Sequence, residues 1–140
     1  MYEYKATIIR VIDGDSILVD IDLGFDIKLS RQSIRLYGVD TPETRTKNPI
    51  EKKCGLVAKE YVKSILKENQ VYHMKTYYDK KGKFGRILAD FYVKTVYLSE
   101  LLISKGYAVK YDGQSKEEIR AAHLANQQRL INEGIITVNG

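Results

Sequence analysis

Short apolar runs separated by tight turn signals fill the N-terminal part of this sequence and constrain its fold most strongly. Residues 4–11, 16–21 and 34–39 are rich in β-branched and aromatic side chains, which favour extended strands. An Asp-Gly-Asp motif at residues 13–15 separates the first two runs, and Gly24 lies between the second and the third. Strands joined by short connections pair most simply as a meander, so we expect antiparallel neighbours here.

A helix is predicted between residues 48 and 69, where apolar residues recur at steps of three and four. Asn48, Pro49 and Glu51 suit its N-cap, first turn and capping box. Gly55 could delay its start, because glycine weakens a helix interior.

Two more strands and two more helices complete the pattern. Residues 71–78 and 86–93 predict strands joined by a polar, glycine-bearing connection. A short helix over residues 98–105 ends at Gly106, and a longer helix over residues 115–133 begins with a capping box. This order predicts an α+β fold rich in β structure, in which three helices pack around an antiparallel five-stranded sheet or barrel.

The composition fits one globular domain. The 140 residues contain no internal repeat, low-complexity tract or interdomain linker, so residues 1–140 are expected to form a single domain. Hydrophobic residues make up 44% and charged residues 29%, as in soluble proteins. The single cysteine, Cys54, excludes an intrachain disulfide and a cysteine-based metal site, and we interpret it as a small buried hydrophobe.

Apolar stretches, the N-terminus and net charge indicate which partners and which location to expect for the chain. No apolar stretch approaches the ~20 residues that span a bilayer, so no membrane partner is expected. The N-terminus lacks the features of a signal peptide, which predicts either a cytoplasmic protein or a mature secreted form whose precursor segment has been removed. A net charge of +5 favours nucleic acid or another anionic partner, because phosphate binding releases counterions. A monomer is expected.

Two acidic clusters stand at the ends of predicted strands. Asp13 and Asp15 follow the first strand, and Asp40 and Glu43 follow the strand that contains Arg35. If these strands are neighbours, the carboxylates converge, and oxygen ligands of this kind suit a hard cation such as Ca²⁺ or Mg²⁺. Taken alone, however, an Asp-Gly pair favours an ordinary hairpin turn.

Arg35 and Arg86 admit two interpretations. Each can be a solvated side chain, on a barrel strand and at a hairpin base respectively. Each can also bind a phosphate, because negative charge gathers at phosphorus during phosphoryl transfer and planar bidentate donors stabilise it. Glu43 likewise suits either a turn cap or a carboxylate that orients an attacking water.

Three motifs in one order resemble the micrococcal (staphylococcal) nuclease family of thermonucleases. They are VIDGDS at residues 11–16, IRLYGVDTPET at residues 34–44 and KFGR at residues 83–86. The resemblance extends from about residue 5 to residue 133. It implies a five-stranded OB-type barrel with three packed helices, in agreement with the elements predicted above.

The resemblance also implies a metal site. Asp15 and Asp40 correspond to the carboxylate ligands of one Ca²⁺ ion, and Thr41 to the residue that supplies its backbone carbonyl. Asp13 corresponds to an acidic residue that supports these ligands without binding the ion itself.

The remaining motif residues correspond to groups that act on the phosphate. The resemblance implies that Arg35 and Arg86 are phosphate clamps and that Glu43 activates or positions the attacking water. All of the catalytic and metal positions of the family are filled in this chain.

The substrate-binding positions depart from the family. Phe84 stands where tyrosine is usual, so its ring can stack but a phosphate-binding hydroxyl is missing. Lys83 either contacts phosphate or belongs to a solvated charged loop, and the resemblance implies that Tyr111 packs against base and sugar. His73 and His123 match no motif position, and we expect both to be structural or surface residues.

The sequence therefore predicts a Ca²⁺-dependent nuclease that hydrolyses phosphodiester bonds of DNA and RNA, preferably single-stranded. The resemblance implies endo- and exonucleolytic cleavage that leaves 3′-phosphate ends. The alternative is a catalytically silent OB-fold module that only binds single strands. Carboxylates that face a phosphate argue against that alternative, because they weaken binding unless a cation lies between them.

Overall fold

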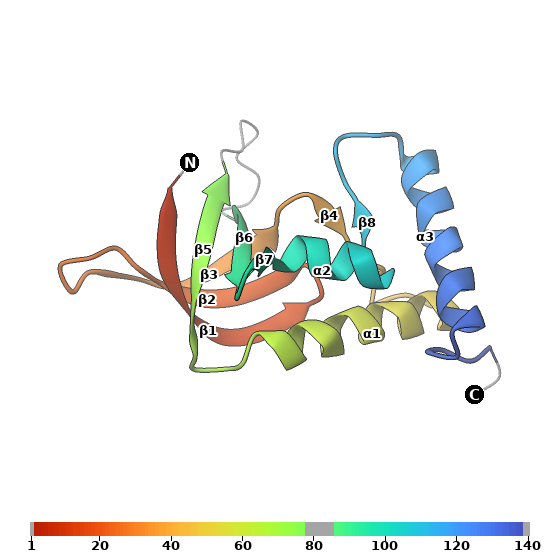
Figure 1. Cartoon of the computed structure of the whole chain (residues 1–140), viewed down its shortest axis with the longest axis horizontal. Coiled ribbons are helices and arrows are strands. Elements are labelled where there is room, and N and C mark those ends of the chain that lie inside the picture. The colour runs from red at the N-terminus through yellow and green to blue at the C-terminus, as the bar shows by residue number, and fades with distance from the viewer. Residues whose placement is uncertain (1, 78–85, 139–140) are drawn as a thin grey trace.

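Five strands form a closed barrel in the computed structural model, which describes residues 2–77 and 86–138 (Figure 1). In sequence order these strands are β1 (Glu3–Asp13), β2 (Ser16–Asp22), β3 (Lys28–Leu36), β5 (Val71–Tyr77) and β6 (Ile87–Val93). Consecutive neighbours pair in the order β3-β2-β1-β5-β6, and β3 closes the barrel by pairing with β6. The expected barrel and its N-terminal meander are confirmed.

The closing pair corrects one expectation. β3 and β6 run parallel, with Ile34 opposite Ile87 and Arg35 opposite Leu88, whereas we expected antiparallel pairing throughout. Both strands leave the barrel at the same end as a result. Parallel neighbours need a long crossover, and here β5 and α1 (Pro49–Ile65) supply it.

Strand β3 also differs from its predicted bounds of residues 34–39. It begins at Lys28, and residues 28–33, which are largely exposed and polar apart from Leu29, extend it without an apolar pattern. It ends at Leu36, and Gly38 then adopts a left-handed conformation with φ of 79°. That turn leads into the short strand β4 (Val39–Asp40), which pairs with β8 (Val109–Lys110).

The described residues contain the three predicted helices, of which the first two pack on the barrel and the third packs on α1 and β8. They are α1, α2 (Leu98–Lys105), which follows the short strand β7 (Val96–Tyr97), and α3 (Lys116–Asn132). In Figure 1, α3 stands at the end of the molecule opposite the β2–β3 connection. Over the described residues, no helix is both long and apolar enough to cross a membrane.

The helix caps follow the sequence signals. The Asn48 side chain accepts hydrogen bonds from the backbone N–H groups of Ile50 and Glu51, at 3.0 and 3.1 Å, so α1 starts at Pro49 and Gly55 does not delay it. Gly106 ends α2 with φ of 77°. Ser115 accepts from Glu118 N at 3.2 Å and starts α3.

Two apolar clusters hold these layers together. The larger one fills the barrel and reaches α1 and α2, with Ile8, Val19, Leu36 and Phe91 among its fully buried members. The smaller one comprises Cys54, Leu130 and Ile136, and it joins the start of α1 to the end of α3. Cys54 is thus buried among apolar residues, as expected.

Candidate active site

The turn between β1 and β2 places Asp15 beside Arg35. Asp13 and Ser16 face each other across a two-residue turn, and Ser16 lies opposite Arg35 on the neighbouring strand. The backbone N–H of Leu36 also donates to the Asp15 carbonyl at 2.9 Å. These backbone contacts fix the two motif segments against each other, although they lie far apart in the sequence.

The guanidinium of Arg35 bridges two carboxylates. Its Nη1 lies 3.4 Å from Asp15 Oδ2, and its Nη2 lies 3.6 Å from Asp40 Oδ1. Nη1 also donates to the Leu36 carbonyl at 2.9 Å, which holds the side chain close to its own strand. The backbone N–H of Thr41, a buried residue, donates to Asp15 Oδ2 at 3.2 Å. Asp15, Arg35, Asp40 and Thr41 therefore converge at one end of the barrel.

The segment that carries Glu43 is held from two sides. The Thr44 hydroxyl donates to Asp13 Oδ1 at 2.8 Å, so Asp13 anchors the segment behind Asp15 and Asp40. On the other side, Gly55 of α1 packs against its backbone. A Cβ atom at residue 55 would lie 2.7 Å from the Glu43 carbonyl oxygen, which leaves room for glycine alone.

The carboxylates create a strongly negative environment around Glu43. Desolvation raises the pKa of Glu43, and the nearby charges of Asp15, Asp40, Asp13 and Glu51 raise it further. The side chain still reaches solvent, which limits the effect of burial. A proton or a cation is therefore favoured at this position.

A cavity of about 820 Å³ opens beside these residues. Arg86 reaches it because the parallel pairing of β3 and β6 brings the start of β6 next to Arg35. Glu43, Asp40 and Tyr111 line it too, and Tyr111 is held there by its backbone N–H, which donates to the Gly38 carbonyl at 2.8 Å. Of the sequence-predicted site residues, Lys83 and Phe84 lie outside the described residues.

His123 joins the site although it matches no motif in the sequence. Its Nε2 lies 2.7 Å from Asp40 Oδ2, and its side chain is only 16% exposed. The prediction of a structural or surface role thus missed its contact with a predicted metal ligand. Asp40 and His123 are 83 positions apart, and only the docking of α3 brings them together.

The donor groups fit a hard divalent cation with few protein ligands. Asp15, Asp40 and the Thr41 carbonyl offer oxygen alone, which suits Ca²⁺ better than a soft metal. Within residues 2–77 and 86–138, no group of three or more His, Cys, Asp or Glu side chains is arranged to hold a metal by itself. An ion at this place would take much of its coordination from solvent or substrate. Burial raises the pKa of Glu43 most, and the charges of Asp15 and Asp40, which raise it further, are charges that such an ion would offset.

Comparison with known proteins identifies the family. A family profile described as staphylococcal nuclease homologue matches residues 33–132. The thermonuclease of Staphylococcus hyicus is 37% identical over 108 residues, covering 76% of this chain and 59% of that protein. The thermonuclease of Staphylococcus intermedius is 37% identical over 101 residues, covering 71% and 55%. Endonuclease YncB of Bacillus subtilis (strain 168) is 32% identical over 104 residues, covering 74% and 46%.

The barrel, its three helices and the matched profile agree, and the chain belongs to the staphylococcal nuclease family. The matches span about half the length of these relatives, between 46% and 59%.

Proposed function

We propose that this protein is a Ca²⁺-dependent nuclease that hydrolyses phosphodiester bonds in DNA and RNA. The observation that carries the proposal is the bridge from Arg35 to Asp15 and Asp40 at the mouth of a cavity that Arg86 and Glu43 also line. Two cationic forks and a group of carboxylates on one cavity suit a reaction in which charge develops on a phosphate.

The arginines bind the reacting phosphate. Arg35 is held by its contact with the Leu36 carbonyl, so its fork is already oriented before substrate arrives. Arg86 approaches from the neighbouring strand, and the two guanidinium groups stabilise charge on the phosphate oxygens as water attacks. Lysine offers no planar fork and would be a poor substitute.

Asp15, Asp40 and the Thr41 carbonyl would hold the Ca²⁺ ion. When bound, the ion supplies positive charge that polarises the phosphate and offsets the repulsion between the carboxylates and the substrate. The hydrogen bond from Thr41 N and the contact with His123 fix the orientation of the two acidic side chains.

Glu43 takes part in proton transfer at the attacking water. The oxygen of water attacks phosphorus in line with the bond to the 5′-oxygen, and one water proton passes to Glu43. The phosphorus–oxygen bond then breaks, the 5′-oxygen leaves with the bonding electron pair and takes a proton from solvent water, and the phosphate stays on the 3′ side. The position of Glu43 supports this role, because it lines the same cavity as the two arginines that are proposed to bind the phosphate.

Single-stranded substrates suit the cavity, because bases must be unstacked to reach Tyr111. Lys83 and Phe84 are proposed to contact the phosphate and a base, and cleavage is proposed both within chains and at their ends. The protein is proposed to act as a monomer.

The test is digestion of heat-denatured DNA and of RNA with Ca²⁺, with Mg²⁺ or with a chelator, followed by analysis of the product ends. We expect cleavage with Ca²⁺, little with Mg²⁺, none with the chelator, and 3′-phosphate ends. Glu43→Gln should abolish most turnover, while the matched control Glu68→Gln, at an exposed residue outside the cavity, should not. Binding without cleavage by the wild-type protein would instead favour the silent binding module.

A further inference from the structure

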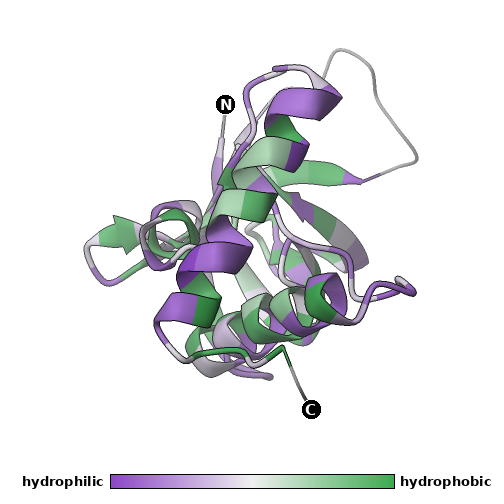
Figure 2. Cartoon of the chain, turned by 90° about the vertical axis from the view of Figure 1, so that its right-hand side faces the viewer, coloured by the Kyte–Doolittle hydropathy of each residue, from purple (hydrophilic) through white to green (hydrophobic). Residues whose placement is uncertain are grey.

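One wall of the cavity comes from α3 and carries none of the motif residues. Its members recur at steps of three and four along the helix, so they share one face. They are Lys116, Ile119, Arg120, His123, Leu124 and Gln127. Figure 2 views the molecule from the side on which α3 lies, and it shows hydrophilic and hydrophobic residues alternating along this helix.

The same cavity is also lined by the catalytic groups. Arg35, Glu43 and Arg86 line it outside α3, and in the proposed reaction they act on one phosphodiester group. A volume of about 820 Å³ is large for that purpose, and it lies towards the upper end of the ~300–1,000 Å³ usual for ligand pockets. The cavity therefore has room for a substrate that continues from the reacting phosphate towards α3.

The chemistry of this wall fits a polyanion with apolar groups. Lys116 and Arg120 are exposed and one helical turn apart, so both cations face the cavity. Neither takes part in an ion pair within the described part of the chain. Ile119 and Leu124 lie between and beside them, and Leu124 is 52% exposed although it is apolar. Phosphates complement the cations, and bases or sugars complement the apolar side chains.

We propose that the face of α3 formed by Lys116, Ile119, Arg120, Leu124 and Gln127 is a subsite for the nucleotides beyond the scissile phosphate. This inference rests on the proposed nuclease function. It gives the protein a preference for polynucleotides over short nucleotide esters, because only a longer chain reaches both walls. The occupant is nucleic acid, since the wall continues directly from the catalytic cavity and its charge is complementary to phosphate.

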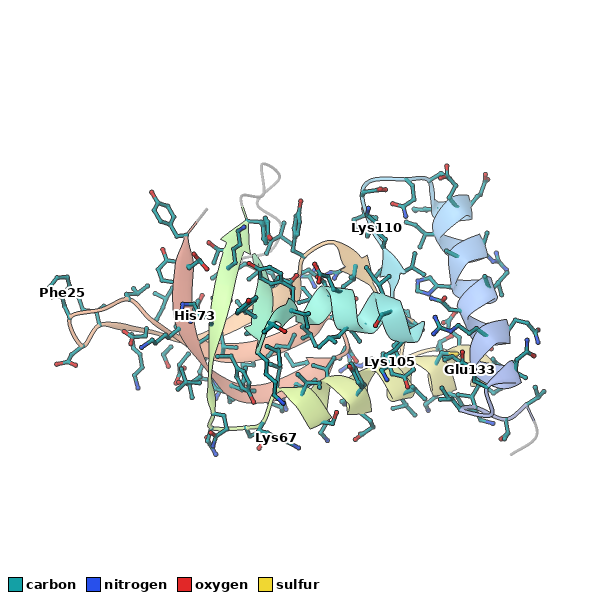
Figure 3. The ribbon with its side chains drawn as sticks, in the orientation of Figure 1. Phe25, Lys67, His73, Lys105, Lys110 and Glu133 are labelled. Atoms are coloured by element: carbon teal, nitrogen blue, oxygen red, sulfur yellow. The ribbon has the colours of Figure 1, made fainter. Side chains whose placement is uncertain are left out.

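The test compares two substrates and two double variants. The substrates are a long single-stranded oligonucleotide and a p-nitrophenyl ester of a single nucleotide. Lys116→Ala with Arg120→Ala removes the two cations of the α3 wall. Lys63→Ala with Lys67→Ala removes the same charge at the far end of α1, outside the cavity. Figure 3 labels Lys67, which lies well away from α3.

The ratio of kcat/KM on the oligonucleotide to that on the ester should fall roughly tenfold in the α3 double variant and stay constant in the control. Oligonucleotide affinity, measured by fluorescence anisotropy, should lose about 1.4 from its slope of log affinity against log salt, or ~0.7 for each lost contact. If the double variant fails to fold, Arg120→Gln alone carries the same comparison with Lys67→Gln.

The possible results distinguish failure of the α3 subsite from failure of the proposed nuclease function. Wild-type protein that hydrolyses neither substrate overturns the nuclease proposal, and the anisotropy slopes still decide whether α3 binds the oligonucleotide. An unchanged ratio and slope in the α3 variant overturn the subsite. Equal losses in the α3 variant and the control also overturn it, because they would mean that net charge alone matters.

Discussion

His123 Nε2 lies 2.7 Å from Asp40 Oδ2, while the other oxygen of the same carboxylate faces Arg35 at 3.6 Å. The last helix thereby holds a side chain that the family resemblance assigns to the metal. Asp40 stands at the end of a two-residue strand and is 34% exposed, so few other contacts restrain it. We conclude that the docking of α3 helps to shape the site.

The first prediction follows from that contact. His123→Ala should weaken Ca²⁺ binding, measured by calorimetry, by about fivefold to thirtyfold, because the loss of one hydrogen bond to a charged group costs ~1–2 kcal/mol. His123→Gln should recover part of the affinity, since its amide can donate to the same oxygen. The control is His73→Ala, because His73 is exposed on β5 and far from α3 (Figure 3). Unchanged Ca²⁺ affinity in His123→Ala would show that the contact is incidental.

A second prediction concerns Gly55, where a Cβ would lie 2.7 Å from the Glu43 carbonyl oxygen and 2.8 Å from that of Pro42. In an open helix, Gly→Ala stabilises by about 1 kcal/mol. Here Gly55→Ala should destabilise the protein to urea and reduce kcat, since the segment carrying Glu43 must move away from α1. Glu60→Ala, at an exposed position of α1, calibrates the ordinary effect of alanine in this helix. A stabilised Gly55→Ala variant with normal kcat would disprove the close packing.

The third prediction is a pH dependence of stability that arises away from the site. Asp90 is 4% exposed, and its Oδ1 accepts hydrogen bonds from Phe91 N at 3.0 Å and Ser99 N at 3.2 Å, while the Ser99 hydroxyl donates to Oδ2. Burial raises the pKa of Asp90 from 3.8 to about 6, and the bonds from Ser99 and Phe91 oppose that rise. The folded protein therefore binds this proton at a higher pH than the unfolded chain does.

The sign of the effect follows from this difference. Above pH 6 the Asp90 carboxylate is ionised in the folded protein, and its burial lowers the free energy of unfolding by the full amount. The free energy of unfolding therefore increases as the pH falls from about 6 to about 4. Asp90→Asn removes the titrating group but keeps an acceptor oxygen. The unfolding free energy of wild type minus that of Asp90→Asn should rise by up to ~3 kcal/mol between pH 7 and pH 4, as measured by urea unfolding. A difference that does not vary with pH would mean that Asp90 does not titrate in this range.

Much of the fold could be predicted because short sequence patterns indicate where its strands and helices lie. The β-branched runs gave the barrel strands, and Asn48 and Ser115 marked the helix starts that the structure contains. Residues 28–33, which are polar apart from Leu29, were not predicted as strand, because an exposed strand extension shows no alternation of apolar residues. The parallel pairing of β3 with β6 was not predicted either, because the local sequence of a strand does not indicate which distant strand it pairs with.

Part of the candidate site could likewise be predicted from local sequence, and part could not. Asp15, Arg35 and Asp40 lie in motifs that can be read from the sequence, and the structure brings them together. The α3 wall and His123 could not be predicted, because their relation to the site depends on how α3 packs. That packing comes from a small apolar cluster at the other end of the helix, around Leu130.

The central claim is that Arg35 acts on the phosphate during hydrolysis, and Arg35→Lys tests it most directly. Single-turnover cleavage of single-stranded DNA in Ca²⁺ should slow by a factor of ~10²–10³, because lysine keeps the charge but loses the planar fork. Arg31→Lys, an exposed position on the same strand and outside the cavity, should cleave at the wild-type rate. Near-wild-type cleavage by Arg35→Lys would contradict the account and leave Arg35 as a structural partner of Asp15 and Asp40.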